Sequence, residues 1–311
     1  MGKINTFDDI IKQLKDLENI NVISGIFKDI KNENNNAEIN IINCINKCTS
    51  PVKLNINDED SVVKNKIQTI FRVFDLFPLS ETRILILGQD PYPEKGKAEG
   101  LAFSVNEDYE SIDESLLNIY KAAGVNINEG TKKSLITWAT NNNVLLLNTA
   151  LTHENSSDET IERHIAVWNP FIIKVINNLI KYKIGAKDDK LSVFLWGEKA
   201  QNVFFQSLNE LNKEEKGHYN QITSHFEEYK ILNKRSKKIL QFKKKNNVIT
   251  GCKEVINIAF YMTYHPSKRY NKGMKIFLEQ TPSNFKACDE FLGKNKKTKQ
   301  YTWEIFPENN E

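Results

Sequence analysis

A carboxylate and two aromatic rings fall within one short stretch of the chain, residues 84–105, which reads ILILGQDPYPEKGKAEGLAFSV. The stretch begins as an apolar predicted strand, continues into a proline-rich turn with Asp90 and Tyr92, and ends in a second predicted strand with Phe103. In an open α/β sheet, ligands bind at the carboxyl ends of the strands, where loops converge around a crevice. We therefore predict that these three side chains line a ligand-binding site at that edge.

The same stretch resembles the catalytic segment of family 1 uracil-DNA glycosylases, which reads GQDPYH and then GLxFSV. Three more blocks resemble that family in the same order: LLLNTALT at 145–152, VFLWGEKAQ at 193–201 and HPS at 265–267. Together the blocks anchor about residues 60–295. Four blocks in the right order are far harder to obtain by chance than one short motif.

The resemblance implies that the chain cleaves a base from deoxyribose. As the N-glycosidic bond breaks, the sugar acquires oxocarbenium character and the base leaves as an anion, so a carboxylate and a hydrogen-bond donor are needed. By resemblance, Asp90 positions the attacking water and stabilises the sugar, while a neutral His265 donates to the pyrimidine O2. Taken singly, an Asp in a turn is more often a local cap and a His a core residue. The ordered blocks favour the catalytic roles.

A base pocket is implied by Phe103 and Asn148, which resemble an aromatic wall and a carboxamide that reads the polar edge of the base. Gln89, which precedes Asp90 in the same motif, is assigned to this pocket too. One amide orientation suits uracil O4 and N3–H, and the flipped orientation suits cytosine N4–H and N3. The choice of base therefore depends on groups that the sequence does not reveal.

Tyr92 belongs to the same pocket, where the family's tyrosine stands against C5 of uracil and is followed by histidine. Here Pro93 follows instead, which removes a backbone N–H and favours an extended Tyr92. Two interpretations stay open. Pro93 either stiffens the same turn, or it displaces the ring and opens room for a substituent at C5.

Three serines resemble residues that grip DNA phosphates around the flipped nucleotide: Ser104, Ser115 and Ser267. Hydroxyl donors at phosphates fix the register of a protein on DNA without reading sequence. Ser115 lies in DESLLNIY, where Asp113 and Glu114 replace the prolines of the family's PPSLxNIY loop. These replacements leave the stiffness and phosphate affinity of that loop open.

Basic residues follow the HPS block and fill an insert before it. Lys268 and Arg269 stand where the family has PLS, and Arg269 falls on the leucine that wedges into the gap left by the flipped base. The insert, about residues 205–250, includes the stretch KRSKKILQFKKKNN at 234–247. Such a run predicts contact with the DNA backbone, or else a solvated surface.

The elements that must position these residues follow from apolar periodicity. Residues 1–60 are interpreted as a helical extension with a helix at 7–30 and a loop at 31–40, and 61–311 as the glycosylase domain. Further helices are predicted at 61–77 and 165–181, and strands at 84–87, 144–147, 191–195 and 255–262. Alternating strands and helices predict an α/β fold: a central, mainly parallel four-stranded sheet flanked by helices, like that of the uracil-DNA glycosylases.

Composition agrees with such a protein. The chain has 311 residues, of which 40% are hydrophobic, and a net charge of +3 that does not by itself indicate nucleic acid. Its four cysteines are scattered, which favours reduced thiols over an iron–sulfur cluster. We expect no metal or cofactor, no membrane segment, and a cytoplasmic monomer, bacterial or phage-associated, that binds DNA.

The sequence thus predicts a monofunctional DNA glycosylase that flips a pyrimidine nucleotide and hydrolyses its glycosidic bond, with uracil as the favoured base. One alternative is excision of a C5-modified cytosine, hydroxymethylated or glucosylated, from phage DNA as antiviral defence. Another is a catalytically silent DNA-binding accessory protein, against which the presence of both Asp90 and His265 argues.

Overall fold

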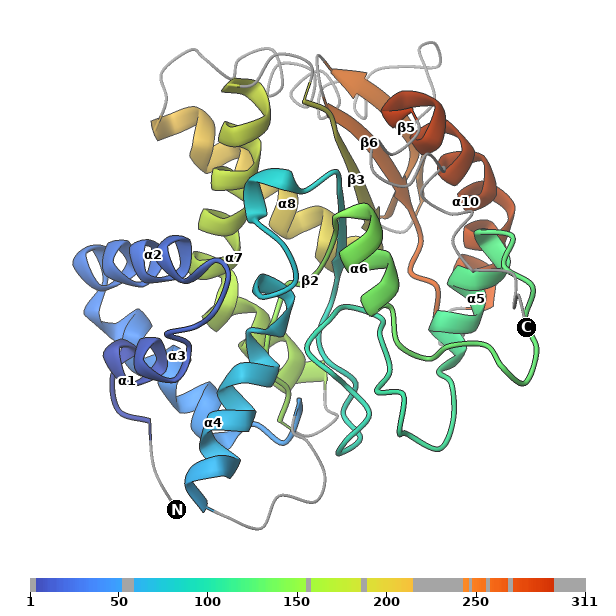
Figure 1. The fold of residues 1–311 in the computed structure, drawn as a ribbon. Coiled ribbons are helices and arrows are strands. Elements are labelled where there is room, and N and C mark those ends of the chain that lie inside the picture. Colours follow the sequence, from blue (N-terminus) through green and yellow to red (C-terminus); the bar gives the residue numbers. More distant parts are fainter. Residues whose placement is uncertain are drawn as a thin grey trace.

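Four apolar runs of the sequence form the parallel centre of one sheet (Figure 1). The computed structural model describes residues 4–51, 59–154, 158–185, 189–214, 243–245, 248–255, 258–267 and 271–293. In this part of the chain six strands lie in the order β2-β1-β3-β6-β5-β4. The parallel ones are β1 (Ile84–Gly88), β2 (Val144–Asn148), β3 (Leu191–Trp196) and β6 (Ile258–Thr263). The predicted mainly parallel four-stranded centre is confirmed.

Two further strands extend the sheet beyond β6. They are β5 (Val248–Val255), antiparallel to β6, and β4 (Lys243–Lys245), antiparallel to β5. The predicted strand at 255–262 is therefore wrong in its start, because Val255 ends β5 and pairs with Ile258 at the beginning of β6. An apolar run does not mark where one strand ends and the next begins. The rest of the basic stretch 234–247 lies outside the described residues.

The parallel register brings the carboxyl ends of the central strands to one edge. Gly88 at the end of β1 pairs with Asn148 at the end of β2, and Trp196 at the end of β3 pairs with Thr263 at the end of β6. All residues of these four strands are buried, as in sheets whose two faces are both covered by helices. The edge is therefore a rigid platform for the loops that follow each strand.

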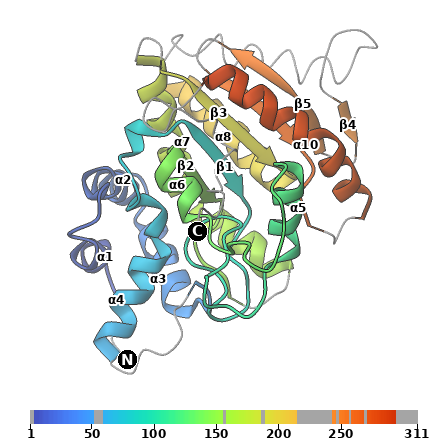
Figure 2. The ribbon, with the colours of Figure 1, turned by 45° about the vertical axis from the view of Figure 1, so that its right-hand side comes forward.

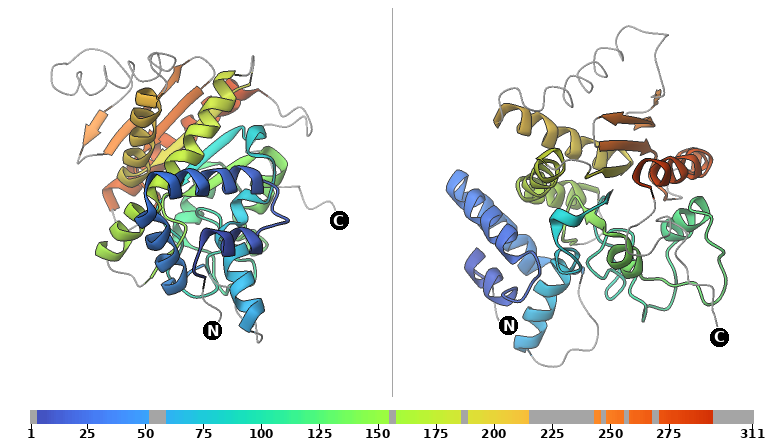
Figure 3. Two further views of the ribbon diagram at one scale, coloured as in Figure 1. Left: turned by 90° about the vertical axis from the view of Figure 1, so that its left-hand side faces the viewer. Right: turned by 45° about the horizontal axis from the view of Figure 1, so that its top comes forward.

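Helices cover both faces of the sheet. The helices α7 (Asp158–Gly185) and α8 (Glu198–Glu214) lie on one face. The helices α6 (Ile136–Asn142) and α10 (Asn271–Leu292) lie on the other, and α5 (Glu114–Ala122) packs on α10. Figure 2 shows α6, α5 and α10 in front of the sheet, and the right-hand view of Figure 3 shows α8 and α10 on opposite sides of it.

The N-terminal helices pack on one another and, through α2 and α3, on α7. They are α1 (Phe7–Gln13), α2 (Ile20–Glu33) and α3 (Asn35–Lys47), followed by α4 (Glu59–Ile70). The rings of Phe7 and Phe27 stack with centroids 4.2 Å apart, and Phe27 lies 5.3 Å from Phe171 of α7. These helices consequently share one apolar core with the sheet domain.

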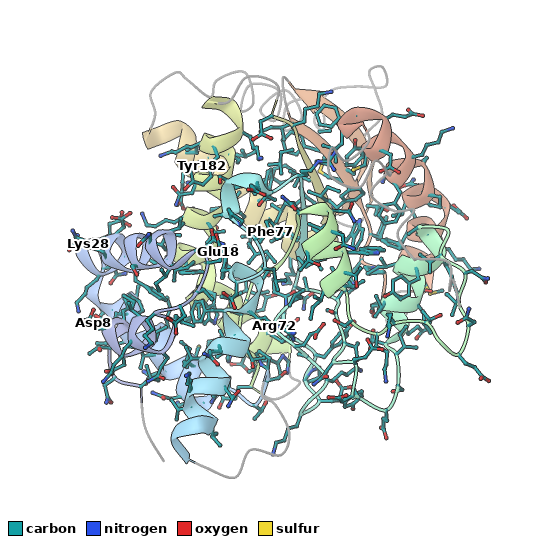
Figure 4. The ribbon with its side chains drawn as sticks, in the orientation of Figure 1. Asp8, Glu18, Lys28, Arg72, Phe77 and Tyr182 are labelled. Carbon is teal, nitrogen blue, oxygen red and sulfur yellow. The ribbon has the colours of Figure 1, made fainter. Side chains whose placement is uncertain are left out.

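Three local predictions in this part of the chain need correction. The helix expected at 7–30 is two helices. The chain between them is held in place where the Asn19 amide donates to the carbonyls of Phe74 and Phe77, the second of which is labelled in Figure 4. The loop expected at 31–40 is wrong, because the Asn34 side chain caps the first turn of α3. The helix expected at 61–77 stops at Ile70 and gives way to a 3₁₀ turn, Arg72–Phe74.

Candidate active site

Two of the predicted pocket residues meet over Gly88 at the end of β1. A Cβ atom at Gly88 would collide with Asn148 Oδ1, and would lie 2.8 Å from the Cβ of Ala102 and 3.3 Å from a ring carbon of Phe103. Glycine is thus required at this position by close approach. Its small size lets the carboxamide of Asn148 and the ring of Phe103 approach the same point of the strand end.

Phe103 is held in an uncommon backbone conformation. The expected strand around it is wrong: residues 101–103 form a turn, and Phe103 has φ 63°. Positive φ is an outlier for a bulky side chain and persists only where the surroundings impose it. The ring packs 5.4 Å from Trp196 and 5.5 Å from His265, centroid to centroid. The strained turn therefore directs the aromatic wall toward the predicted catalytic histidine.

His265 follows β6, and its surroundings favour the neutral form of its ring. Its Nδ1 accepts the backbone N–H of Ser267 at 3.1 Å, so in the neutral ring the proton is assigned to Nε2. Desolvation lowers the pKa of His265 from 6.5 to about 4, against the opposing influence of the Asp90 and Asp113 carboxylates. The backbone of Gly197, with φ 94°, passes so close that its Cβ would lie 3.1 Å from the Cβ of His265.

Asp90 has a partner that the sequence analysis missed. Its Oδ2 lies 2.7 Å from Nδ1 of His153, and the side chains are 13% and 3% exposed, respectively. His153 directly follows the LLLNTALT block and is one of only five histidines in the chain. That position is the only sequence signal that could have pointed to it.

The loops after β1 and β2 are joined beside this pair. The Gln89 carbonyl accepts the backbone N–H of Ala150 at 3.0 Å and the hydroxyl of Thr149 at 2.7 Å. Gln89 and Asp90 are both partly exposed. The bonds hold the Asp90 turn against the loop that leads to His153.

Tyr92 lies over the backbone of Phe103. Its hydroxyl donates to the Phe103 carbonyl at 3.2 Å, and the Lys97 ammonium lies 4.7 Å from the centre of its ring. Burial, and then the Asp113 carboxylate, raise the pKa of Tyr92 well above its usual value, so the hydroxyl stays protonated. Lys97 in turn pairs with Asp113 at 3.0 Å. The ring is therefore fixed beside the aromatic wall in spite of Pro93.

The predicted phosphate-binding serines lie in different surroundings. Ser104 is fully buried, donates to the Glu99 carboxylate and accepts the backbone N–H of Leu135 at 2.6 Å. The same carboxylate pairs with Arg72 at 2.8 Å. A phosphate contact from Ser104 would require these bonds to be exchanged. Its position identifies it first as a structural residue of the Phe103 turn.

Ser115 lies in α5 and Ser267 in the HPS loop, two segments that one hydrogen bond joins directly. The Asn118 amide of α5 donates to the Pro266 carbonyl at 2.8 Å. Asp113 caps α5 by accepting the Ser115 N–H at 2.8 Å, so the replacement of the family's proline provides a helix cap here. Lys268 and Arg269 lie outside the described residues.

The described cysteines lie in the interior of the protein. Cys44, Cys48 and Cys288 are buried, and burial raises the pKa of both Cys44 and Cys48 to about 11. No group of three His, Cys, Asp or Glu side chains among the described residues is arranged to hold a metal ion. None of the described helices is long and apolar enough to cross a membrane.

Comparisons with known proteins agree with the motifs. The family model of the uracil DNA glycosylase superfamily matches residues 74–293. Uracil-DNA glycosylases of Streptococcus pyogenes, serotype M49 strain NZ131 and serotype M3 strain SSI-1, are each 37% identical over 137 residues, 43% of this chain and 58% of theirs. The chain thus spans less than two thirds of the length of these relatives.

Two solved structures of similar proteins have lower sequence identity to this chain. Mimivirus uracil-DNA glycosylase is 20% identical with a TM-score of 0.46, covering 66% of this chain and 67% of that one. The wild-type UNG structure from Nitratifractor salsuginis is 25% identical with a TM-score of 0.35, covering 45% and 64% of the two chains.

Proposed function

Since this chain belongs to the uracil-DNA glycosylase superfamily, we propose that it is a monofunctional DNA glycosylase. It flips a pyrimidine nucleotide out of DNA and hydrolyses the N-glycosidic bond, with uracil as the favoured base. The observation that carries the proposal is the combination at one sheet edge of the Asp90 carboxylate and a His265 ring whose pKa is lowered to about 4.

The two groups match the two charges that develop in the reaction. When the bond between C1′ and the base nitrogen breaks, its electron pair leaves with the base and its negative charge grows on O2. The Nε2–H of His265 donates to that oxygen, while the Asp90 carboxylate stabilises the cationic sugar and orients water toward C1′. Water supplies the hydroxyl that bonds to C1′ and, in net terms, the proton that the departed base acquires.

The base is held by stacking and by edge contacts. The ring of Phe103 offers a face for stacking, a contact worth about 1–3 kcal/mol per base. The carboxamide of Asn148, beside that ring at Gly88, offers one donor side and one acceptor, as uracil N3–H and O4 require. Flipping costs a few kcal/mol, so both contacts are needed to offset it.

Tyr92 supports uracil over a C5-modified cytosine. Three contacts hold it: its hydroxyl on the Phe103 carbonyl, the Lys97 ammonium over its ring, and its carbonyl bonded by the Ser50 hydroxyl at 2.6 Å. These contacts favour the first interpretation of Pro93, in which the turn is stiffened and Tyr92 closes the pocket beside C5. A glucosylated substituent would require these contacts to break.

The test is base release from duplexes that carry uracil, thymine, cytosine, hydroxymethylcytosine or its glucosylated form, followed by cleavage at abasic sites. We expect release of uracil alone, and release of thymine after Tyr92→Ala, because that change opens the C5 side. Robust release of the glucosylated base with little release of uracil would instead support the defence alternative. DNA binding without release of any base would support the accessory-protein alternative.

A further inference from the structure

We propose that His153 is a positioning residue for Asp90, and that a strap from the N-terminal region, residues 49 and 50, holds His153 in place. The inference rests on the proposed function, because it assigns His153 a part in the same reaction. Neither His153 nor the strap belongs to the sequence blocks that mark the site. The strap also precedes residues 74–293, where the family model matches.

His153 lies behind the carboxylate, away from solvent. The contact between Nδ1 of His153 and Oδ2 of Asp90 is 2.7 Å, and Asp90 is the more exposed member at 13% against 3%. A carboxylate only accepts, so Nδ1 carries the proton and donates it. A buried hydrogen bond to a charged group is stronger than a neutral one and fixes orientation.

The arrangement leaves the catalytic side of Asp90 free. Oδ1 of Asp90 has no hydrogen-bond partner in the described part of the chain, whereas Oδ2 is occupied by His153. One oxygen thus anchors the group, and the other is available to water or to the sugar. An anchored carboxylate needs no reorganisation when charge develops, which is the main source of electrostatic catalysis.

The strap binds the backbone of His153 on both sides. The His153 carbonyl accepts the N–H groups of Thr49 at 2.9 Å and Ser50 at 3.3 Å, and its own N–H donates to the Ser50 carbonyl at 2.9 Å. Ser50 is fully buried, and its hydroxyl also bonds the Tyr92 carbonyl at 2.6 Å. A single residue of the N-terminal region therefore joins the two loops that carry Asp90 and His153.

The decisive experiment compares His153→Asn with His153→Leu, two side chains of nearly equal shape. The Asn amide nitrogen is attached at the same position as Nδ1 and preserves the donor to Asp90, whereas Leu removes it. In single-turnover excision of uracil from duplex DNA, we expect His153→Asn to stay within about threefold of wild type and His153→Leu to lose about 10- to 100-fold. DNA affinity should change less than twofold in both.

A matched control removes another buried histidine from the neighbourhood. His164 on α7 bonds the Thr152 hydroxyl at 2.8 Å and makes no described contact with Asp90. His164→Leu should lower the midpoint of thermal unfolding while leaving the excision rate of the folded protein unchanged. If His153→Leu does not fold, His153→Gln replaces it, since its longer stem moves the amide away from Asp90 and should slow excision at least tenfold relative to His153→Asn.

Two outcomes would overturn the role of His153 alone: wild-type excision by His153→Leu, or equal losses in the Asn and Leu variants. A second test compares the excision rate of the double variant Asp90→Asn/His153→Leu with that of Asp90→Asn alone. The two rates should be equal, because the histidine acts through the Asp90 carboxylate. A further loss of tenfold would also refute the role of His153.

Absence of base release by the wild-type protein would instead refute the proposed function. In that case, NMR of ¹⁵N-labelled histidine still tests whether Nδ1 of His153 carries a hydrogen-bonded proton. The Asp90→Ala substitution should abolish that hydrogen bond.

Discussion

Asp90 and His265 lie at the same edge of the sheet, but their surroundings differ in kind. Asp90 is partly open to solvent and is hydrogen-bonded to His153 at 2.7 Å. His265 packs 5.5 Å from the ring of Phe103, and desolvation lowers its pKa to about 4. Both side chains are partly exposed. One side of the site, the polar side, supports a charge through a hydrogen bond, and the other, the dry side, disfavours a charge because protein atoms partly desolvate the histidine ring.

Under the proposed function, this difference lets one strand edge serve both halves of a bond cleavage. The polar side belongs to the loops after β1 and β2, and the dry side belongs to the loop after β6 and to the Phe103 turn. Titratable groups in different environments of one site can take different roles in a reaction. The comparison predicts that changes on the two sides have different consequences.

The largest expected effect comes from removing the charge on the polar side. Asp90→Asn keeps the shape but loses the negative charge that stabilises the sugar cation, so excision of uracil should slow about a thousandfold or more. Binding of the same duplex should stay within a few-fold. Single-turnover kinetics and a gel-shift titration measure the two quantities, and near-normal excision would remove Asp90 from the reaction.

Removing the donor on the dry side should have the next largest effect. His265→Ala should slow excision about 100- to 1000-fold, since a single hydrogen bond to a developing anion contributes about 2.7–4 kcal/mol. Substrates with a better leaving group need this bond less, so 5-fluorouracil should be affected less than uracil. Equal losses on both bases would contradict the assigned role.

The dry side also predicts how stability depends on pH. The pKa of His265 is about 4 when folded against 6.5 as its ordinary value, so between these pH values the unfolded chain takes up a proton that the folded protein refuses. His265 therefore favours unfolding increasingly as the pH falls from 6.5 to 4. Over that window, wild type should lose about 1–3 kcal/mol more stability than His265→Gln. Parallel losses in urea titrations would show that His265 is not desolvated.

The smallest expected effect concerns the contact between the two pocket walls. Gly88→Ala places a methyl group against Asn148 and Phe103, so excision should fall about tenfold, a change of about 1.4 kcal/mol. Gly25→Ala is the matched control, because a Cβ in that helix meets nothing within 4 Å and should instead stabilise it by about 0.5–1 kcal/mol. Unchanged excision kinetics in Gly88→Ala would mean that Asn148 and Phe103 do not contact the base together.

Sequence reasoning predicted the sheet well wherever strands are buried on both faces. Strands β1, β2 and β3 appear as continuous apolar runs, and their observed limits differ from the expected ones by a single residue. The boundary between β5 and β6 was missed because residues 255–262, VINIAFYM, are apolar except for Asn257, so the pattern did not show that one strand ends at Val255 and the next begins at Ile258. The helix at Asn35 was missed because asparagine is common both in loops and in helix caps.

The sequence predicted only those site residues that lie inside a recognisable motif. The motifs indicated Asp90 and His265, and the structure places them in Coulombic range of each other. His153 lies 63 residues from Asp90, and Ser50 lies 42 residues from Tyr92, so their contacts depend on how the loops meet in space. The positive φ of Phe103 is likewise imposed by its surroundings and leaves no mark in the sequence.

The central claim is that a charged Asp90 and a neutral His265 together release uracil, and the pH dependence of single-turnover excision from pH 5 to 8 tests it most directly. The account predicts release of free uracil and no inflection attributable to His265, because the pKa of that residue is about 4. Absence of uracil release, or an inflection near pH 6.5 that disappears in His265→Gln, would contradict it.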